Sequence, residues 1–115
     1  MAIPKPGKPV RGSSSGAPVM AIFDLLGRRW AMGIVWQLSG GPLPFTVLQS
    51  RCSSISPTIL STRIKDLTEA GIIERTLDGY MLTKTGMELF RILEPFQDWS
   101  VKWAKKFRQE AGPID

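Results

Sequence analysis

Apolar residues recur at spacings of three and four between residues 18 and 38, which is the pattern of amphipathic α-helices. The first stretch contains Val19, Ile22, Leu25 and Leu26, and Gly27 is a candidate for its C-cap. A second apolar stretch runs from about Arg29 to Leu38, and residues 39–42 (Ser-Gly-Gly-Pro) end it. The pattern therefore predicts two consecutive helices.

Two further helices are predicted between residues 43 and 70. Residues 43–45 are long enough only for a strand stub, and a short helix follows that ends near Arg51 or Cys52. Its inward residues are expected to be Phe45, Val47 and Leu48. Ser56 and Pro57 suit the N-cap and the first position of a longer helix. Leu60, Ile64 and Leu67 then form the core stripe of that helix over residues 56–70.

Residues 72–82 have the alternation of a β-hairpin. Residues 72–77 alternate as a strand does, Asp78-Gly79 is a strong signal for a two-residue turn, and residues 80–82 return as the partner strand. Thr83 or Thr85 can cap a further helix that contains Met87, Leu89, Phe90 and Leu93. Pro95 either kinks that helix or restarts it, and an aromatic series at helical spacing follows to Phe107.

This order of elements predicts a fold of the mainly α (α+β) class. Two tightly joined helices followed by a hairpin are typical of a winged helix-turn-helix, with the two-stranded hairpin as its wing. We expect residues 17–110 to form one domain, residues 111–115 to be a flexible tail, and residues 1–16 to be a disordered basic arm carrying Lys5, Lys8 and Arg11. Winged helices also serve as protein-interaction modules, so the fold leaves the function open.

Composition excludes most enzyme classes. The chain has no histidine and one cysteine, Cys52, so the common nucleophile–base pairs and cysteine metal sites cannot be built. Phosphate-binding glycine motifs are also missing, so we expect neither an enzyme nor a bound cofactor or metal. The apolar runs are too short for a membrane helix, which makes a cytoplasmic protein the default expectation.

Charge is distributed unevenly along the chain. Residues 1–65 contain eight Lys or Arg and one acidic residue, which gives a net charge of +7. Residues 66–115 contain seven Lys or Arg and nine acidic residues, which gives a net charge of −2. The positive half is the half with the predicted recognition helix, which favours a polyanionic partner. Charge alone does not distinguish DNA from RNA or an acidic membrane.

Several segments together resemble a known family. They are Asp24 to Trp30 (DLLGRRW), Gly41-Pro42 with Phe45, Ile55 to Leu67 (ISPTILSTRIKDL), Gly71 to Arg75 (GIIER) and Tyr80 to Gly86 (YMLTKTG). This combined pattern over residues 17–107 resembles the HxlR-type regulators, relatives of the MarR group. The resemblance implies a prokaryotic, homodimeric winged-helix repressor or activator that binds a pseudo-palindromic operator, with its N- and C-terminal helices forming the dimer interface.

The sequence departs from this family in two places. Members often carry a sensor cysteine just before the first helix, where this chain has Ala17, so a cysteine switch is not expected and Cys52 is interpreted as a buried structural thiol. The wing turn is also shorter than usual. We therefore hypothesise that the basic arm substitutes for the wing in contacting DNA.

The candidate site residues fall into two sets. For DNA contacts we predict Ser56, Pro57, Thr58, Ser61, Thr62, Arg63, Lys65, Arg75, Lys84, Arg28 and Arg29, with Arg63 suited equally to a phosphate contact or an internal salt bridge. For dimerisation we predict Ile22, Leu26, Phe90, Phe96, Trp99, Trp103 and Phe107, although the aromatic series could instead line an effector pocket. The expected partners are double-stranded DNA and a second copy of the chain; a small-molecule effector is allowed but not indicated. The alternative functions are a protein-interaction module and a non-specific DNA-binding protein.

Overall fold

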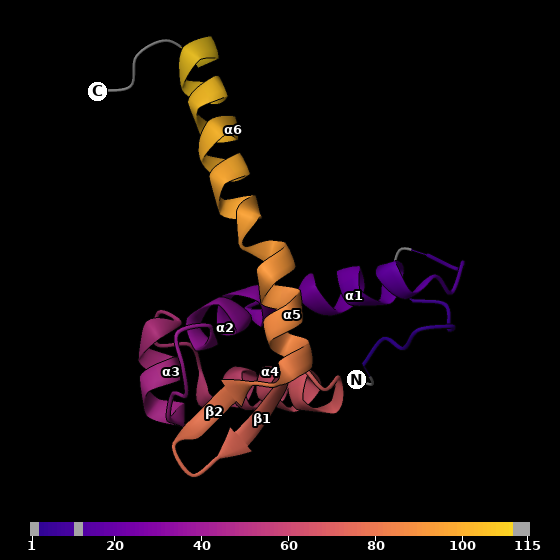
Figure 1. The fold of residues 1–115 in the computed structure, drawn as a ribbon, viewed down its shortest axis with the longest axis vertical. Coiled ribbons are helices and arrows are strands. Elements are labelled where there is room, and N and C mark those ends of the chain that lie inside the picture. Colours follow the sequence, from indigo (N-terminus) through magenta and orange to yellow (C-terminus); the bar gives the residue numbers. More distant parts are fainter. Residues whose placement is uncertain (1–2, 11–12, 112–115) are drawn as a thin grey trace.

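The computed structural model describes residues 3–10 and 13–111, and side chains up to residue 108. Within this part of the chain the elements are α1 (Pro18–Leu26), α2 (Ala31–Leu38), α3 (Phe45–Arg51), α4 (Pro57–Glu69), β1 (Ile73–Thr76), β2 (Gly79–Leu82), α5 (Lys84–Leu93) and α6 (Pro95–Ala111). Figure 1 shows α2, α3, α4 and the hairpin gathered into one body, from which α6 projects as a single helix. The predicted order of elements and the mainly α fold class with its hairpin wing are confirmed.

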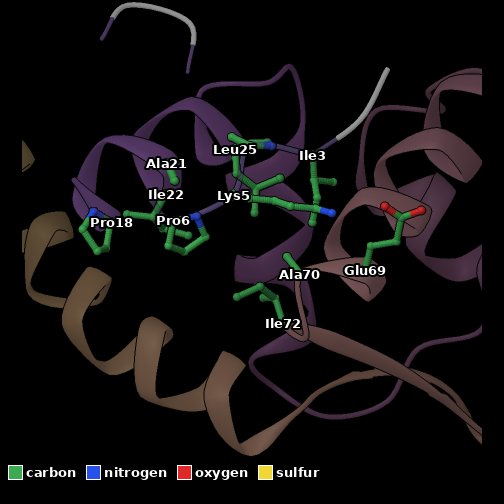
Figure 2. Close-up of a pocket in the computed structure, with 11 residues that line it drawn as sticks. Ile3, Lys5, Pro6, Pro18, Ala21, Ile22, Leu25, Glu69, Ala70 and Ile72 are labelled. Carbon is green, nitrogen blue, oxygen red and sulfur yellow. The ribbon is translucent and has the colours of Figure 1, made fainter. Parts of the chain in front are cut away.

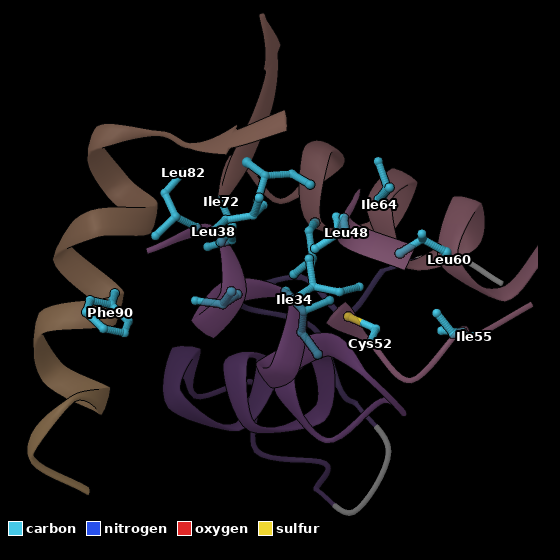
Figure 3. Close-up of a cluster of buried hydrophobic side chains, with 14 residues drawn as sticks. Ile34, Leu38, Leu48, Cys52, Ile55, Leu60, Ile64, Ile72, Leu82 and Phe90 are labelled. Atoms are coloured by element: carbon cyan, nitrogen blue, oxygen red, sulfur yellow. The ribbon is translucent and has the colours of Figure 1, made fainter. Parts of the chain in front are cut away.

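The core lies between α2, α3, α4, the hairpin and α5 (Figure 3). Its largest fully buried side chains are Ile34, Leu38, Leu48, Leu60, Leu67, Ile73 and Val35. Burial of each such aliphatic side chain contributes roughly 1.5–3 kcal/mol. The predicted stripe on α4 is confirmed, because Leu60, Ile64 and Leu67 are all buried. Val47 is different: it was expected to face inward, but it is 38% exposed because the one-residue step from Leu48 carries it out of the core-facing side of α3.

α4 begins and ends where its sequence signals predict. The Ser56 hydroxyl accepts a hydrogen bond from the Ile59 N–H at 3.2 Å, and Pro57 occupies the first helical position. At the other end Ala70 is the C-cap, and Gly71 follows with a left-handed φ of +75°. By contrast, α2 starts at Ala31 and not at Arg29, because Trp30 has a φ of +74°, which is incompatible with a right-handed helix.

The hairpin is confirmed, but the predicted position of its turn is wrong by one residue. β1 and β2 pair antiparallel with Thr76 opposite Gly79, so the turn residues are Leu77 and Asp78. Thr76 closes this turn, since its Oγ1 accepts from the Asp78 N–H and donates to the Gly79 carbonyl. Gly79 is thereby a strand residue, with a φ of +116°.

A third segment pairs with the hairpin. Leu43 and Tyr80 exchange two backbone N–H to carbonyl hydrogen bonds, both of 2.9 Å, across an isolated antiparallel bridge. This is the strand stub expected at residues 43–45. This pairing explains the shifted turn. Residue 79 lies so close to the Leu43 backbone that a side chain there would overlap the Leu43 carbonyl group, and only glycine fits.

The C-terminal helices are joined at Glu94. The Thr83 Oγ1 caps α5 by accepting from the Gly86 N–H at 3.0 Å, which confirms one of the two predicted caps. Pro95 begins α6, so it restarts the helix, as one of the two alternatives had it. Along α6 every described side chain from Pro95 to Arg108 is exposed or half-buried. No described side chain of α6 is therefore fully buried within the protomer.

Part of the predicted basic arm has a definite place in the structure. The Gly7 N–H donates to the Gly16 carbonyl at 2.9 Å, and Ile3 packs against the core. Figure 2 shows Ile3, Lys5 and Pro6 beside Ile22 and Leu25 of α1 and Ala70 at the end of α4. Ordering this segment costs conformational entropy, which its composition suggested would keep it disordered. Burial of the apolar Ile3 side chain offsets part of that cost. Arg11 and residues 112–115 of the predicted tail lie outside the described residues.

None of the helices in the described residues combines the length and apolar character that crossing a membrane requires.

Candidate nucleic-acid interface

α3 and α4 are joined by a short turn that Gln49 holds through hydrogen bonds. Ser53 and Ser54 have left-handed φ values of +58° and +54°, and the buried Ile55 follows them. Gln49 holds the turn from both sides: its carbonyl accepts from the Ser54 N–H, and its Nε2 donates to the Ile55 carbonyl at 2.8 Å. α3, this turn and α4 have the arrangement of a helix-turn-helix, a motif whose second helix is the recognition helix in DNA-binding proteins.

The face of α4 opposite the core is polar and uncovered. Thr58, Ser61, Thr62 and Lys65 are all exposed, and Ser56 and Pro57 are exposed at the N-terminal end. The Thr62 Oγ1 donates to the Thr58 carbonyl at 2.9 Å, so the oxygen lone pairs of this hydroxyl point outward as acceptors. The structure thus brings six of the predicted DNA contacts together, on a surface whose short side chains allow close approach to a nucleic acid.

Arg28 and Arg63 are placed differently from the other predicted contacts. The Nη1 atoms of both arginines lie 3.2 Å from Oδ2 of Asp66, and the side chains of Arg28 and Asp66 are only 9% and 7% exposed. The Arg63 Nε–H also donates to the Arg29 carbonyl at 2.7 Å. Of the two alternatives for Arg63, the structure therefore has the internal salt bridge. Asp66 was missed at the sequence level, although its i,i+3 spacing from Arg63 was a visible signal.

Three further predicted cations lie on the surface. The guanidinium carbon of Arg29 is 5.6 Å from the centre of the Trp30 ring, and that of Arg75 is 5.9 Å from the centre of the Tyr80 ring. Lys84 is exposed at the start of α5. Stacking against an aromatic ring restricts an arginine side chain but leaves its hydrogen-bond donors in solvent. These residues are therefore available to an anionic partner.

The residues predicted for dimerisation divide between the interior and the surface. Leu26 and Phe90 are buried within the protomer, where the Phe90 ring meets the Trp36 ring edge-on at 5.1 Å. Ile22 is half-buried beside residues 3–6. The four remaining aromatics form a row along α6, with ring centres 5.7, 6.0 and 5.0 Å apart, and each is at least half exposed: Phe96, Trp99, Trp103 and Phe107.

An apolar hollow of about 360 Å³ adjoins this row, between α1, α2 and the start of α6. Phe23 and Met32 line it together with Trp36 and Phe96, and both are at least half exposed. Sequence reasoning did not single out Phe23 or Met32. Their apolar character at exposed helical positions was the signal available.

Cys52 is buried at the end of α3, as its interpretation as a structural thiol requires. Burial raises the pKa of this thiol above its ordinary value, because the thiolate is poorly solvated there. The environment of Cys52 is the opposite of the electropositive, accessible surroundings that activate sensor thiols.

Comparison with known proteins agrees with this geometry. Residues 25–108 match the family described as HxlR-like helix-turn-helix. YvaP of Bacillus subtilis, described as an uncharacterized HTH-type transcriptional regulator, is 31% identical over 87 residues, which cover 70% of this chain and 81% of YvaP. The structure of quinone-bound YodB from B. subtilis superposes with a TM-score of 0.68 at 32% identity, covering 73% of this chain and 96% of YodB.

A second solved structure is similar. It is described as a possible HxlR family transcriptional factor from Thermoplasma volcanium, and it has a TM-score of 0.66 at 34% identity over 73% of this chain and 82% of its own. The family assignment and the helix-turn-helix described above lead to the same conclusion. The chain belongs to the HxlR-like helix-turn-helix family and is a DNA-binding transcriptional regulator.

Proposed function

We propose that this regulator binds a pseudo-palindromic operator as a homodimer, with α4 of each protomer in the major groove. The observation that carries the proposal is that one chain has two separate solvent-exposed surfaces of different composition. One is the polar face of α4, and the other is the aromatic row on α6. The first has the composition of a groove-reading surface and the second that of a protein interface.

On α4, base contacts are assigned to Thr58, Ser61, Thr62 and Lys65. Hydroxyls can accept from or donate to base edges, and Pro57 can contact a thymine methyl group. Ser56, at the N-terminus of the helix, lies where backbone N–H groups favour a phosphate. Because hydroxyl contacts discriminate weakly between bases, part of the sequence specificity comes from DNA shape.

Phosphate contacts are assigned to Arg29, Arg75 and Lys84. All three are exposed, and they come from the α1–α2 connection, the wing and the start of α5. Contacts from three separate elements would fix the orientation of α4 in the groove without reading sequence. Arg28 and Arg63 are left out of this set because Asp66 binds both of them.

Dimerisation is assigned to α6, with α1 beside it. Phe96, Trp99, Trp103 and Phe107 would pack against the same residues of a second copy, and Phe23 of α1 extends this apolar surface next to Phe96. A contiguous row of exposed aromatics is rare on a soluble monomer and is typical of an interface. A symmetric dimer then presents two α4 helices to two half-sites about one helical turn apart, or a multiple of that spacing.

Selection of bound duplexes from a random pool, at several salt concentrations, tests this proposal. Recovery of an inverted repeat supports it, whereas recovery of no preferred sequence indicates a non-specific DNA-binding protein. A Thr62→Ala variant should then lose affinity for the selected site. Thr68→Ala is the matched control, because Thr68 lies on the same helix and donates the same type of bond, to the Ile64 carbonyl at 2.7 Å. Equal losses in the two variants would contradict the assigned face.

A further inference from the structure

Asp66 is a buried charge in a surface helix. Among the residues whose burial the structure describes, it is the one polar or charged residue that is buried, at 5% exposure. Ionised carboxylates are costly to bury, and they are found inside proteins when cationic partners hydrogen-bond to them. Asp66 has two such partners, Arg28 and Arg63, both at 3.2 Å from the same oxygen.

These bonds join two parts of the chain, the α1–α2 connection and α4. Arg28 follows the end of α1, Arg29 precedes α2, and Arg63 and Asp66 lie in α4. Arg28 and Asp66 are 38 residues apart in the sequence, and the Arg63 Nε–H reaches back 34 residues to the Arg29 carbonyl. The α1–α2 connection is thereby attached to the recognition helix through charged hydrogen bonds, which are stronger than neutral ones.

The same bonds withhold two positive charges from the surface. Arg63 follows Thr62 by one residue, so it lies about 100° further around the helix axis, between the polar face and the core stripe of α4. A side chain of this length extends to the protein surface when no internal partner holds it. In the structure that side chain is directed to Asp66 and is 21% exposed. A phosphate contact made by Arg63 would carry no sequence information and would add affinity for every duplex.

We propose that Asp66 is a positioning residue for DNA recognition, which keeps Arg28 and Arg63 from contacting phosphates and fixes α4 against the α1–α2 connection. It thus favours operator binding over non-specific binding. This inference rests on the proposed role of α4 in reading the operator. Removing the carboxylate should therefore increase non-specific affinity while specific recognition declines, a combination that simple loss of folded protein does not produce.

The test replaces Asp66 with asparagine and compares the selected operator with a random duplex over a range of salt concentrations. We expect the Asp66→Asn variant to bind the random duplex more tightly than the parent, with a salt slope steeper by about 0.9 for each phosphate that a released arginine neutralises. The ratio of operator to random affinity should fall by about tenfold, comparable to the loss from one wrong base pair. Circular dichroism establishes that each variant is folded at the temperature used.

Two further variants identify the cause. Combining Asp66→Asn with Arg63→Met should remove the part of the added salt slope that Arg63 contributes, and any increase that remains is assigned to Arg28. Glu69→Gln is the charge-matched control, since Glu69 is an exposed carboxylate on the same helix. If Glu69→Gln changes the affinity ratio and slope as much as Asp66→Asn does, the effect is one of net charge and the inference is overturned.

A conservative variant covers the case in which Asp66→Asn does not fold. Arg63→Lys keeps the charge but has one nitrogen where Arg63 uses two, Nε for the Arg29 carbonyl and Nη1 for Asp66, so it should weaken this attachment and lower the affinity ratio in the same direction. An Arg63→Lys protein with the affinity ratio of the parent would overturn the inference. Thr62→Ala is measured in parallel: if it weakens operator binding while the Asp66 and Arg63 variants change nothing, only the present inference fails. If Thr62→Ala also has no effect, the proposed role of α4 fails.

Discussion

The α-carbon of Gly79 lies directly against the carbonyl group of Leu43, where the wing meets the connection between α2 and α3. A Cβ atom at position 79 would overlap the carbonyl carbon and oxygen of Leu43, and the φ of +116° is one that other residues rarely adopt. The Gly79→Ala variant should therefore lower the free energy of unfolding by roughly 2–4 kcal/mol, from backbone strain and overpacking together. Denaturant titration followed by circular dichroism measures this loss.

Gly33→Ala is the control for that experiment. Gly33 is exposed in the middle of α2, and a Cβ added there meets no atom within 4 Å. Replacement by alanine should stabilise the protein by up to about 1 kcal/mol through helix propensity. A loss at Gly33 equal to that at Gly79 would show that the Leu43 contact is not what position 79 requires.

Thr83, between the wing and α5, makes both a helix-capping hydrogen bond and a tertiary hydrogen bond. Its Oγ1 accepts from the Gly86 N–H and donates to the Gly71 carbonyl, which follows α4. Thr83→Ala should cost about 1–3 kcal/mol, because a helix cap and a tertiary hydrogen bond are removed together. Thr85→Ala, at an exposed position in the same helix, should change the unfolding midpoint little. Similar midpoints for both variants would argue against the capping role.

The aromatic row on α6 predicts which substitutions should weaken the proposed dimer. Trp103 is 50% exposed and is the ring that contacts both Trp99 and Phe107. Trp103→Ala should weaken self-association by about 2 kcal/mol or more, as truncation of a central interface tryptophan usually does. Sedimentation equilibrium at several protein concentrations measures it. Lys102→Ala, on the adjacent position, should leave the association constant nearly unchanged, and a reversed order of effects would place the interface elsewhere.

Burial of Cys52 predicts slow thiol chemistry. Because the pKa of the folded-state thiol is raised, a disulfide reagent at neutral pH should modify Cys52 at least about tenfold faster in denaturant than in buffer. The raised pKa also gives a pH dependence of stability. The native state favours the protonated thiol, so this contribution is complete below the ordinary pKa of 9.0 and is lost as the pH rises through the folded-state value. Rapid labelling of native protein would contradict the buried position.

The hypothesis that the basic arm contacts DNA needs point variants and not a truncation. Deleting residues 1–16 would also remove Ile3 from the core, which confuses stability with binding. Lys5 and Lys8 are exposed, so the double variant Lys5→Ala, Lys8→Ala should keep the melting temperature of the parent. Its salt slope for DNA binding should decrease by about 0.9 for each phosphate that these lysines neutralise in the parent. The charge-matched pair Lys105→Ala, Lys106→Ala on α6 should not change the slope, and an unchanged slope in the arm variant would sink the hypothesis.

The sequence by itself determined the local elements and the exposed polar surface of α4. Ser56, Pro57 and the Leu60–Ile64–Leu67 stripe set the start and the buried side of α4, because capping and helical periodicity are properties of neighbouring residues. Once one side of α4 is buried, Thr58, Thr62 and Lys65 must face outward. The hairpin, and a helix cap at Thr83 or Thr85, followed from equally local signals, and the structure selected Thr83.

Only the tertiary structure decided the features that depend on distant residues. The turn falls at Leu77-Asp78, against its own sequence signal, because Gly79 is needed beside Leu43. Arg63 and Arg28 turn inward because Asp66 becomes buried between them, and Phe90 packs on Trp36 within the protomer while Trp103 stays uncovered. Each outcome is set by which chain segments meet in the folded molecule, and spacing along the sequence does not contain that information.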